Sequence, residues 1–183
     1  MVYVFLADGF EEIEAITVID VLRRGGITVE TISITKERTV MGAHGVPVIA
    51  DGSLSNVHVD RADMIVLPGG MPGTKHLGES ETLKGIIEEM IEADKYVSAI
   101  CAAPSVLGQM GLLKGKNATC YPGFEKELNG ANHLTDEVVQ DGKITTSRGP
   151  GTAMDFAYHL VDILKGQLES NTLKRGMIYR QTY

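Results

Sequence analysis

The length, composition and charge of the chain exclude several classes of protein. Its 183 residues are 43% hydrophobic and 22% charged, which is typical of one soluble globular domain spanning residues 1–183. The net charge of −7 argues against a nucleic acid or an anionic membrane surface as partner, and no apolar run reaches the roughly 18 residues of a membrane span. Two cysteines are too few for a disulfide framework, so we expect reduced thiols and a cytoplasmic location.

The first part of the chain alternates between strand and helix patterns. Apolar or β-branched runs predict extended segments at residues 2–7, 28–34, 46–50 and 63–70. Residues 11–24 predict a helix, because basic residues and then glycines follow its periodic apolar positions.

The middle of the chain continues this alternation. Ser80 is a predicted N-cap for a helix through Ala93, because its hydroxyl can accept a backbone N–H. A strand over residues 96–100, a helix after Cys101 and a hairpin over residues 137–147 are expected to follow.

The last predicted helix runs from Thr152 to Leu164, with Thr152 and Asp155 as a capping pair. Its predicted buried face consists of Phe156, Leu160, Ile163 and Leu164. The order of elements predicts an α/β fold with a mainly parallel sheet covered by helices on both faces. Ligands of such sheets bind beyond the carboxyl ends of the strands.

Cys101 lies between a predicted strand and its helix, where serine hydrolases hold their nucleophile. The neighbouring Ala99, Ala102 and Ala103 are small enough for a sharp turn, and Pro104 suits the first helical turn. The helix N-terminus is expected to favour the thiolate and to lower its pKa. A buried structural cysteine is the alternative, because cysteine is among the most buried residue types.

Glu14 is the second unusual residue. At 100° per residue it falls on the apolar side of the first helix, between Val18 and Val21. Glu12 falls near the polar flank, and Glu11 lies at the helix start, where water or the helix dipole can hold it. A buried carboxyl group keeps its proton, so Glu14 could hydrogen-bond a thiolate and shuttle a proton. A glutamate reaching into solvent from the helix edge is the alternative.

Four segments, in order and spacing, resemble the ThiJ/PfpI superfamily: "LADGFEEIEAITVIDVLRRGGI", "DMIVLPGG", "SAICAAP" and "TTSRGPGTAMDFA". The resemblance implies a flavodoxin-like three-layer sandwich with a nucleophile elbow, and a homodimer. It also implies that Cys101 is catalytic and hydrogen-bonded to a protonated Glu14. By position, the backbone N–H groups of Gly70 and Ala102 would form an oxyanion hole.

The chain departs from the superfamily at two positions. Some members have a histidine where this chain has Tyr121, and the peptidase members have one where it has Ala102. A cysteine peptidase needs such a base, so only His76, expected to be an exposed loop residue, could revive that function. We expect Tyr121, Pro122 and Arg148 to line the pocket, and Arg148 to hold an anion of the substrate or of a dimer.

No cofactor and no metal are predicted. The segments "SRGPGT" and "LPGGMPG" match neither phosphate-loop nor dinucleotide-binding motifs. His133 and His159 lack metal-ligand spacing with either cysteine. Cys120 is either a resolving thiol or, more in keeping with its type, a passive one.

The resemblance implies a cofactor-independent glyoxalase, in which Cys101 attacks a 2-oxoaldehyde such as methylglyoxal and Glu14 moves a proton. It also implies a related deglycase activity on glycation adducts, and hence a role in stress protection. The expected partner is a small reactive carbonyl or glycated substrate. Two alternatives stay open: a peptidase or amidase, and an oxidation-sensing stress protein or chaperone without turnover, whose Cys101 is oxidised.

Overall fold

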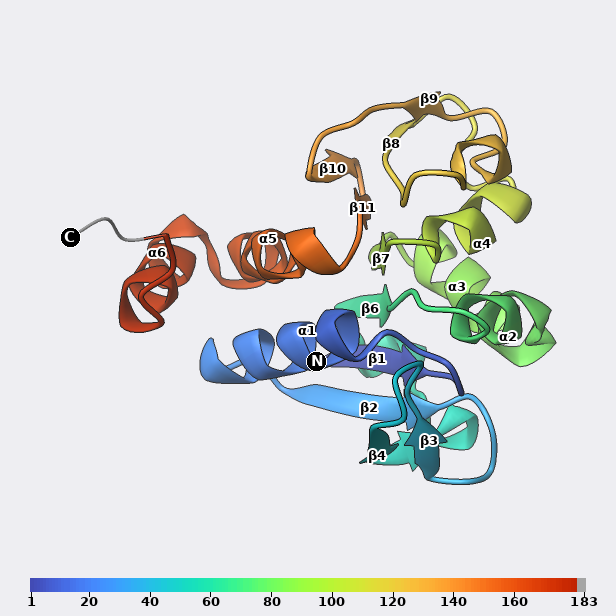
Figure 1. Cartoon of the computed structure of the whole chain (residues 1–183), viewed down its shortest axis with the longest axis horizontal. Helices are drawn as coiled ribbons and strands as arrows, with labels where there is room; N and C mark the ends of the chain where they lie inside the picture. Colours follow the sequence, from blue (N-terminus) through green and yellow to red (C-terminus); the bar gives the residue numbers. More distant parts are fainter. Residues whose placement is uncertain (181–183) are drawn as a thin grey trace.

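A seven-stranded sheet forms the centre of the protein, whose computed structural model describes residues 1–180 (Figure 1). Its strands are β1 (Val2–Leu6), β2 (Val29–Ser33), β5 (Gly52–Ser53), β6 (Met64–Leu67), β7 (Tyr96–Ile100), β10 (Val138–Asp141) and β11 (Ile144–Ser147). They lie in the order β10-β11-β7-β6-β1-β2-β5. Neighbouring strands are parallel except at the β10–β11 hairpin, which confirms the predicted mainly parallel sheet.

Helices cover both faces of this sheet. They are α1 (Glu12–Arg24), α2 (Gly73–Glu79), α3 (Glu81–Glu92), α4 (Pro104–Gln109), α5 (Ala153–Lys165) and α6 (Gln167–Gly176). Helices α1 and α5 pack side by side on one face, with α6 against α5, while α2, α3 and α4 lie on the other face (Figure 1). The three layers confirm the flavodoxin-like sandwich.

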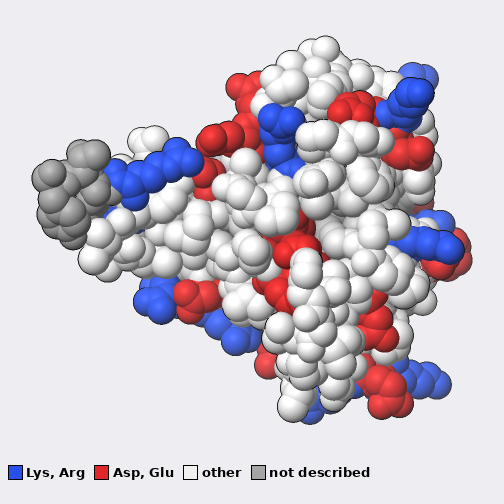
Figure 2. Space-filling model, viewed as in Figure 1, with Lys and Arg blue, Asp and Glu red and all other residues white. Residues whose placement is uncertain are grey.

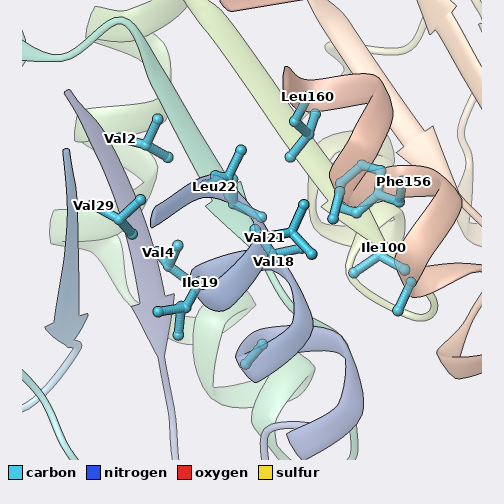
Figure 3. Close-up of a cluster of buried hydrophobic side chains, with 14 of the residues drawn as sticks. Val2, Val4, Val18, Ile19, Val21, Leu22, Val29, Ile100, Phe156 and Leu160 are labelled. Atoms are coloured by element: carbon cyan, nitrogen blue, oxygen red, sulfur yellow. The ribbon is translucent and has the colours of Figure 1, made fainter. Parts of the chain in front are cut away.

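Alternation along the strands divides the core into two halves. Val2 and Val4 of β1 point toward α1 and α5, whereas Tyr3 and Phe5 point toward the helices of the opposite face. In Figure 3, apolar side chains of α1 fill the space between the strands and α5. Burying each such side chain contributes about 1.5–3 kcal/mol. This packing fixes the rotation of α1, and that rotation turns Glu14 into the interior.

Short elements lie outside the main sheet. They are β3 (Thr39–Met41), β4 (Pro47–Ile49), β8 (Asn117–Ala118) and β9 (Asn132–His133), with 3-10 turns η1 (Leu54–Asn56), η2 (Val59–Arg61), η3 (Glu125–Glu127) and η4 (Pro150–Thr152). The extended segment predicted at 46–50 is confirmed as β4, which pairs with β3 in a separate antiparallel hairpin.

Two predictions at the last long helix are wrong. The Thr152 hydroxyl makes no cap bond to α5, because it bonds the Gly149 carbonyl and the Ser147 hydroxyl. Asp155 accepts hydrogen bonds from the Tyr179 hydroxyl and from Arg180. The expected buried residues Ile163 and Leu164 are only partly buried, near the end of α5.

Helices α2 and α6 were not predicted. The glycines of α2 and the proline before it read as a turn, and α6 buries only Ser170, so it lacks an apolar stripe. The predicted Ser80 cap of α3 is confirmed, since its hydroxyl accepts the Leu83 N–H at 3.3 Å.

The charged side chains form no continuous basic area on the face shown in Figure 2, where lysines and arginines are scattered around the rim. Across residues 1–180, none of the helices combines the length and the apolar character that crossing a membrane requires.

Candidate active site

Cys101 occupies a sharp turn between β7 and α4. Its φ of +67° is in the left-handed region, which is uncommon for a residue with a side chain. Two long-range bonds hold this backbone: the Cys101 N–H donates to the Ser147 carbonyl at 2.9 Å, and its carbonyl accepts the Tyr121 N–H at 2.8 Å. The residue is buried, with 8% of its surface exposed. The predicted sharp turn between strand and helix at Cys101 is confirmed.

Glu14 reaches the same point from α1. It is fully buried, and its Oε2 accepts the Gly69 backbone N–H at 2.7 Å. A Cβ placed on Gly69 would lie 2.6 Å from the Cys101 Cβ and 2.8 Å from Glu14 Oε2. Acid and cysteine therefore flank one glycine, and only the missing side chain lets them meet.

The two side chains shift each other's protonation. Burial raises the pKa of Glu14 to about 7, against the opposing effect of the Cys101 and Gly69 hydrogen bonds. Burial and the negative charge of Glu14 raise the pKa of the Cys101 thiol above its ordinary range. The prediction of a lowered thiol pKa is therefore wrong, and burial of the sulfur is the main reason. A six-residue helix provides too little dipole to offset a buried carboxylate.

Gly70 and Ala102 provide backbone N–H groups beside the sulfur. Both N–H groups hydrogen-bond the Cys101 side chain and lower its pKa, opposing the burial. Gly70 has a φ of +91°, and a Cβ there would lie 2.4 Å from the Glu11 nitrogen. Only glycine fits this close approach. The two donors thus lie where the sequence comparison expected an oxyanion hole.

Tyr121, Pro122 and Arg148 line one cavity of about 320 Å³, together with Glu137 and the segment 149–152. The Tyr121 ring lies over Gly149, where a Cβ would contact it at 3.0 Å. Cys101 itself does not line this cavity; the link is the Tyr121 N–H on the Cys101 carbonyl. The three residues expected to line the pocket therefore share one cavity, but this cavity lies next to Cys101 and does not contain its sulfur.

The remaining candidates contribute less. His76 lies on α2 rather than in a loop, and its Nδ1 is 2.9 Å from the Asp8 carbonyl oxygen.

Cys120 is buried, and burial raises its pKa to about 11, which favours a passive thiol. Sequence reasoning missed Gly69, although the Pro68-Gly69-Gly70 triplet after a buried strand was a usable signal.

Comparisons with known proteins find relatives over most of the chain. The sequence pattern of the DJ-1/PfpI family matches residues 1–163. Protein dj-1beta of Drosophila melanogaster is 38% identical over 96% of this chain and 95% of its own length. The glutathione-independent glyoxalase DJR-1.2 of Caenorhabditis elegans is 34% identical over 91% and 89%. The structure of oxidized Toxoplasma gondii DJ-1 superposes with a TM-score of 0.94 at 35% identity, covering 98% of each chain.

Proposed function

This chain belongs to the DJ-1/PfpI family, and we propose that it is a cofactor-independent glyoxalase with Cys101 as nucleophile. The observation that carries the proposal is the meeting of Cys101 and buried Glu14 at Gly69. The Caenorhabditis elegans relative that carries the name of a glutathione-independent glyoxalase supports the same chemistry. The proposed substrate is a 2-oxoaldehyde such as methylglyoxal, and the product is the corresponding 2-hydroxy acid.

The reaction begins when the Cys101 sulfur attacks the aldehyde carbon and forms a hemithioacetal. The N–H groups of Gly70 and Ala102 stabilise the oxygen that gains negative charge in this step. Protonated Glu14 gives its proton to that oxygen and, now a carboxylate, removes the proton from the same carbon and returns it to the neighbouring carbon. The hydroxyl proton moves to the ketone oxygen, which leaves a thioester beside an alcohol. Water hydrolyses the resulting thioester, and the hydroxy acid leaves with the thiol regenerated. The overall change adds one water and needs no external oxidant or reductant.

The shifted pKa of Glu14 suits both directions of proton transfer. A group with a pKa of about 7 is present in both protonation states near neutral pH. Protonation of Glu14 removes the negative charge that adds to the effect of burial on the Cys101 pKa, so the thiolate forms more readily when Glu14 carries its proton. Tyr121, Pro122 and Arg148 line a cavity beside the cysteine, and we propose that they bind the larger part of a glycated substrate, where Arg148 suits an anionic group.

The same site supports deglycation of early carbonyl adducts, since a hemithioacetal forms from their carbonyl group as well. The second candidate function is oxidation sensing without turnover. It is favoured by the Toxoplasma gondii relative, which is described as oxidized. The peptidase alternative lacks a base beside the thiol, because His76 is engaged with the Asp8 carbonyl.

The test measures lactate formation from methylglyoxal without glutathione. We expect Cys101→Ser and Glu14→Gln to lower kcat/KM by at least 100-fold, whereas Cys120→Ser stays within threefold of the wild type. Equal lactate formation by wild type and Cys101→Ser refutes the glyoxalase. Gain of two oxygens at Cys101 under mild peroxide, with no carbonyl turnover, would favour the sensor.

We also propose a homodimer in the cytoplasm. The outer side of α1 and the β3–β4 hairpin together form an exposed apolar face. Its residues are Ile13, Ile16, Met41, Val46 and Ile49. Hydrogen bonds from the His44 and Val46 N–H groups to Glu12 join the hairpin to the start of α1, so the face is continuous. Large exposed apolar patches favour association. The reduced state of both cysteines is in keeping with a cytoplasmic location.

A further inference from the structure

We propose that Glu11, Glu12 and His44 form a binding site for a zinc-type divalent cation. One carboxylate oxygen from each glutamate and one ring nitrogen of His44 all lie within 4.8 Å of one another. Glu11 and Glu12 begin α1, whereas His44 lies in the turn between β3 and β4, so folding brings together residues more than 30 positions apart. The site adjoins the Cys101–Glu14 pair, since the Glu11 charge acts on Glu14. Its three ligands are other residues, so the proposal does not depend on the glyoxalase proposal.

The distances between the ligand atoms fit one bound ion. His44 Nδ1 lies 2.9 Å from Glu12 Oε2 and 3.6 Å from Glu11 Oε2. An ion about 2.1 Å from each ligand atom places neighbouring ligands about 3.0–3.4 Å apart, for angles between octahedral and tetrahedral. The observed separations lie on either side of this range. Small side-chain rotations therefore suffice to complete the coordination.

Glu11 supplies an independent reason to expect a ligand. The residue is 9% exposed, and within residues 1–180 its carboxylate accepts no hydrogen bond. Its neighbours in the cluster are the His44 ring, at 3.6 Å, and the like-charged Glu12 carboxylate, within 4.8 Å. A largely buried carboxylate with one long contact to a histidine and a second carboxylate beside it is costly, and a cation would lower that cost. The backbone of Glu11 is held in place, because its N–H donates to the Gly69 carbonyl at 2.9 Å.

The protein holds the other two ligands equally firmly. Glu12 Oε1 accepts the His44 N–H at 2.7 Å, which leaves Oε2 directed at the His44 ring. A Cβ on Gly42 would lie 2.2 Å from Glu12 Oε1, so this glycine makes room for the carboxylate. The Ala43 N–H also donates to the Phe10 carbonyl at 2.8 Å and docks the turn. These bonds preorganise the cluster before any ion arrives.

The ligand chemistry selects the class of cation. Imidazole nitrogen and carboxylate oxygen together suit zinc and neighbouring first-row ions, whereas magnesium and calcium prefer all-oxygen sites. In the single chain the His44 side chain is 70% exposed, so an ion can enter from solvent before the proposed dimer forms. All three ligands come from one chain, so one ion per chain is expected whether or not the chain pairs.

The experiment titrates zinc chloride into the full chain by isothermal calorimetry in a buffer that does not chelate zinc. Thiols also bind zinc, so Cys101→Ser serves as a background that removes the reactive cysteine. We expect one zinc per chain in wild type and in Cys101→Ser. His44→Ala and Glu11→Gln should each weaken binding at least tenfold. His133→Ala, at an exposed histidine on β9, is the matched control and should bind as wild type does.

Folding is checked by circular dichroism, and His44→Ala is safe in this respect because the Glu12 bond to residue 44 uses the backbone N–H. The proposal is overturned if zinc does not bind wild type, if either ligand variant binds with unchanged affinity, or if Cys101→Ser abolishes binding. It is supported if both ligand variants lose affinity while His133→Ala and Cys101→Ser keep it.

Discussion

At the scale of single residues, the site depends on a glycine that carries no chemistry of its own. Gly69 donates its N–H to Glu14, and its missing side chain leaves room for Cys101. The acid and the thiol come from α1 and from the turn after β7, so neither segment alone could bring them together. A glycine at the end of β6 is the point at which they meet.

Replacing this glycine should therefore separate the pair. In Gly69→Ala the new Cβ would overlap the Cys101 Cβ and Glu14 Oε2, so one of them must move. We expect glyoxalase kcat/KM to fall at least tenfold and stability to fall by about 1–3 kcal/mol. Gly85→Ala is the control, because a Cβ there meets no atom within 4 Å. Full activity in Gly69→Ala would contradict this account of the site.

At the scale of elements, the pairing of α1 with α5 positions Glu14. Side chains of α1 interlock with Phe156 and Leu160 over the sheet (Figure 3), and this contact sets which side of α1 faces inward. A glutamate is buried here because its apolar neighbours on α1 fix the rotation of the helix. The stability of the interface thus supports the catalytic geometry.

Leu22→Ala tests this interface, because Leu22 is fully buried on α1. Removing its side chain leaves a cavity and should lower the free energy of unfolding in urea by about 2–5 kcal/mol. Leu168→Ala is the matched control, since Leu168 on α6 is 80% exposed and should change stability by less than about 0.5 kcal/mol. Equal losses of unfolding free energy in the two variants would show that the packing of α1 contributes little to stability.

At the scale of the whole molecule, burial of Glu14 links stability to pH. The folded-state pKa of Glu14 is about 7, above its ordinary value of 4.5, so folding favours the protonated form. The contribution of protonated Glu14 to the free energy of unfolding is present in full below about pH 4.5 and is lost as the pH rises to about 7. Relative to Glu14→Gln, the wild type should lose up to about 3 kcal/mol over this window. Urea unfolding of both proteins across it provides the measurement, and a constant difference would contradict the raised pKa.

The exposed apolar face is a second property of the whole molecule. Ile16 is 42% exposed on α1, within the face proposed to pair in a homodimer. Ile16→Lys places a charge there and should shift sedimentation from dimer toward monomer, while Ile178→Lys, at a 58% exposed position elsewhere, should not. Wild type that sediments as a monomer at all concentrations would exclude this pairing.

The sequence alone predicted the longer strands, the longer helices and the turn at Cys101, and it favoured an inward Glu14 without deciding against a solvent-facing one. These follow from local periodicity and from the order of elements, which a chain carries in consecutive residues. It missed α2 and α6, which lack a clear apolar period.

Only the tertiary structure decided the protonation of the Cys101–Glu14 pair, the shared cavity of Tyr121, Pro122 and Arg148, and the meeting of Glu11, Glu12 and His44. Burial and charge at each of these places come from segments far apart in the chain. The sequence pattern shows which residues turn inward, but the energy of a buried charge depends on neighbours that folding brings to it.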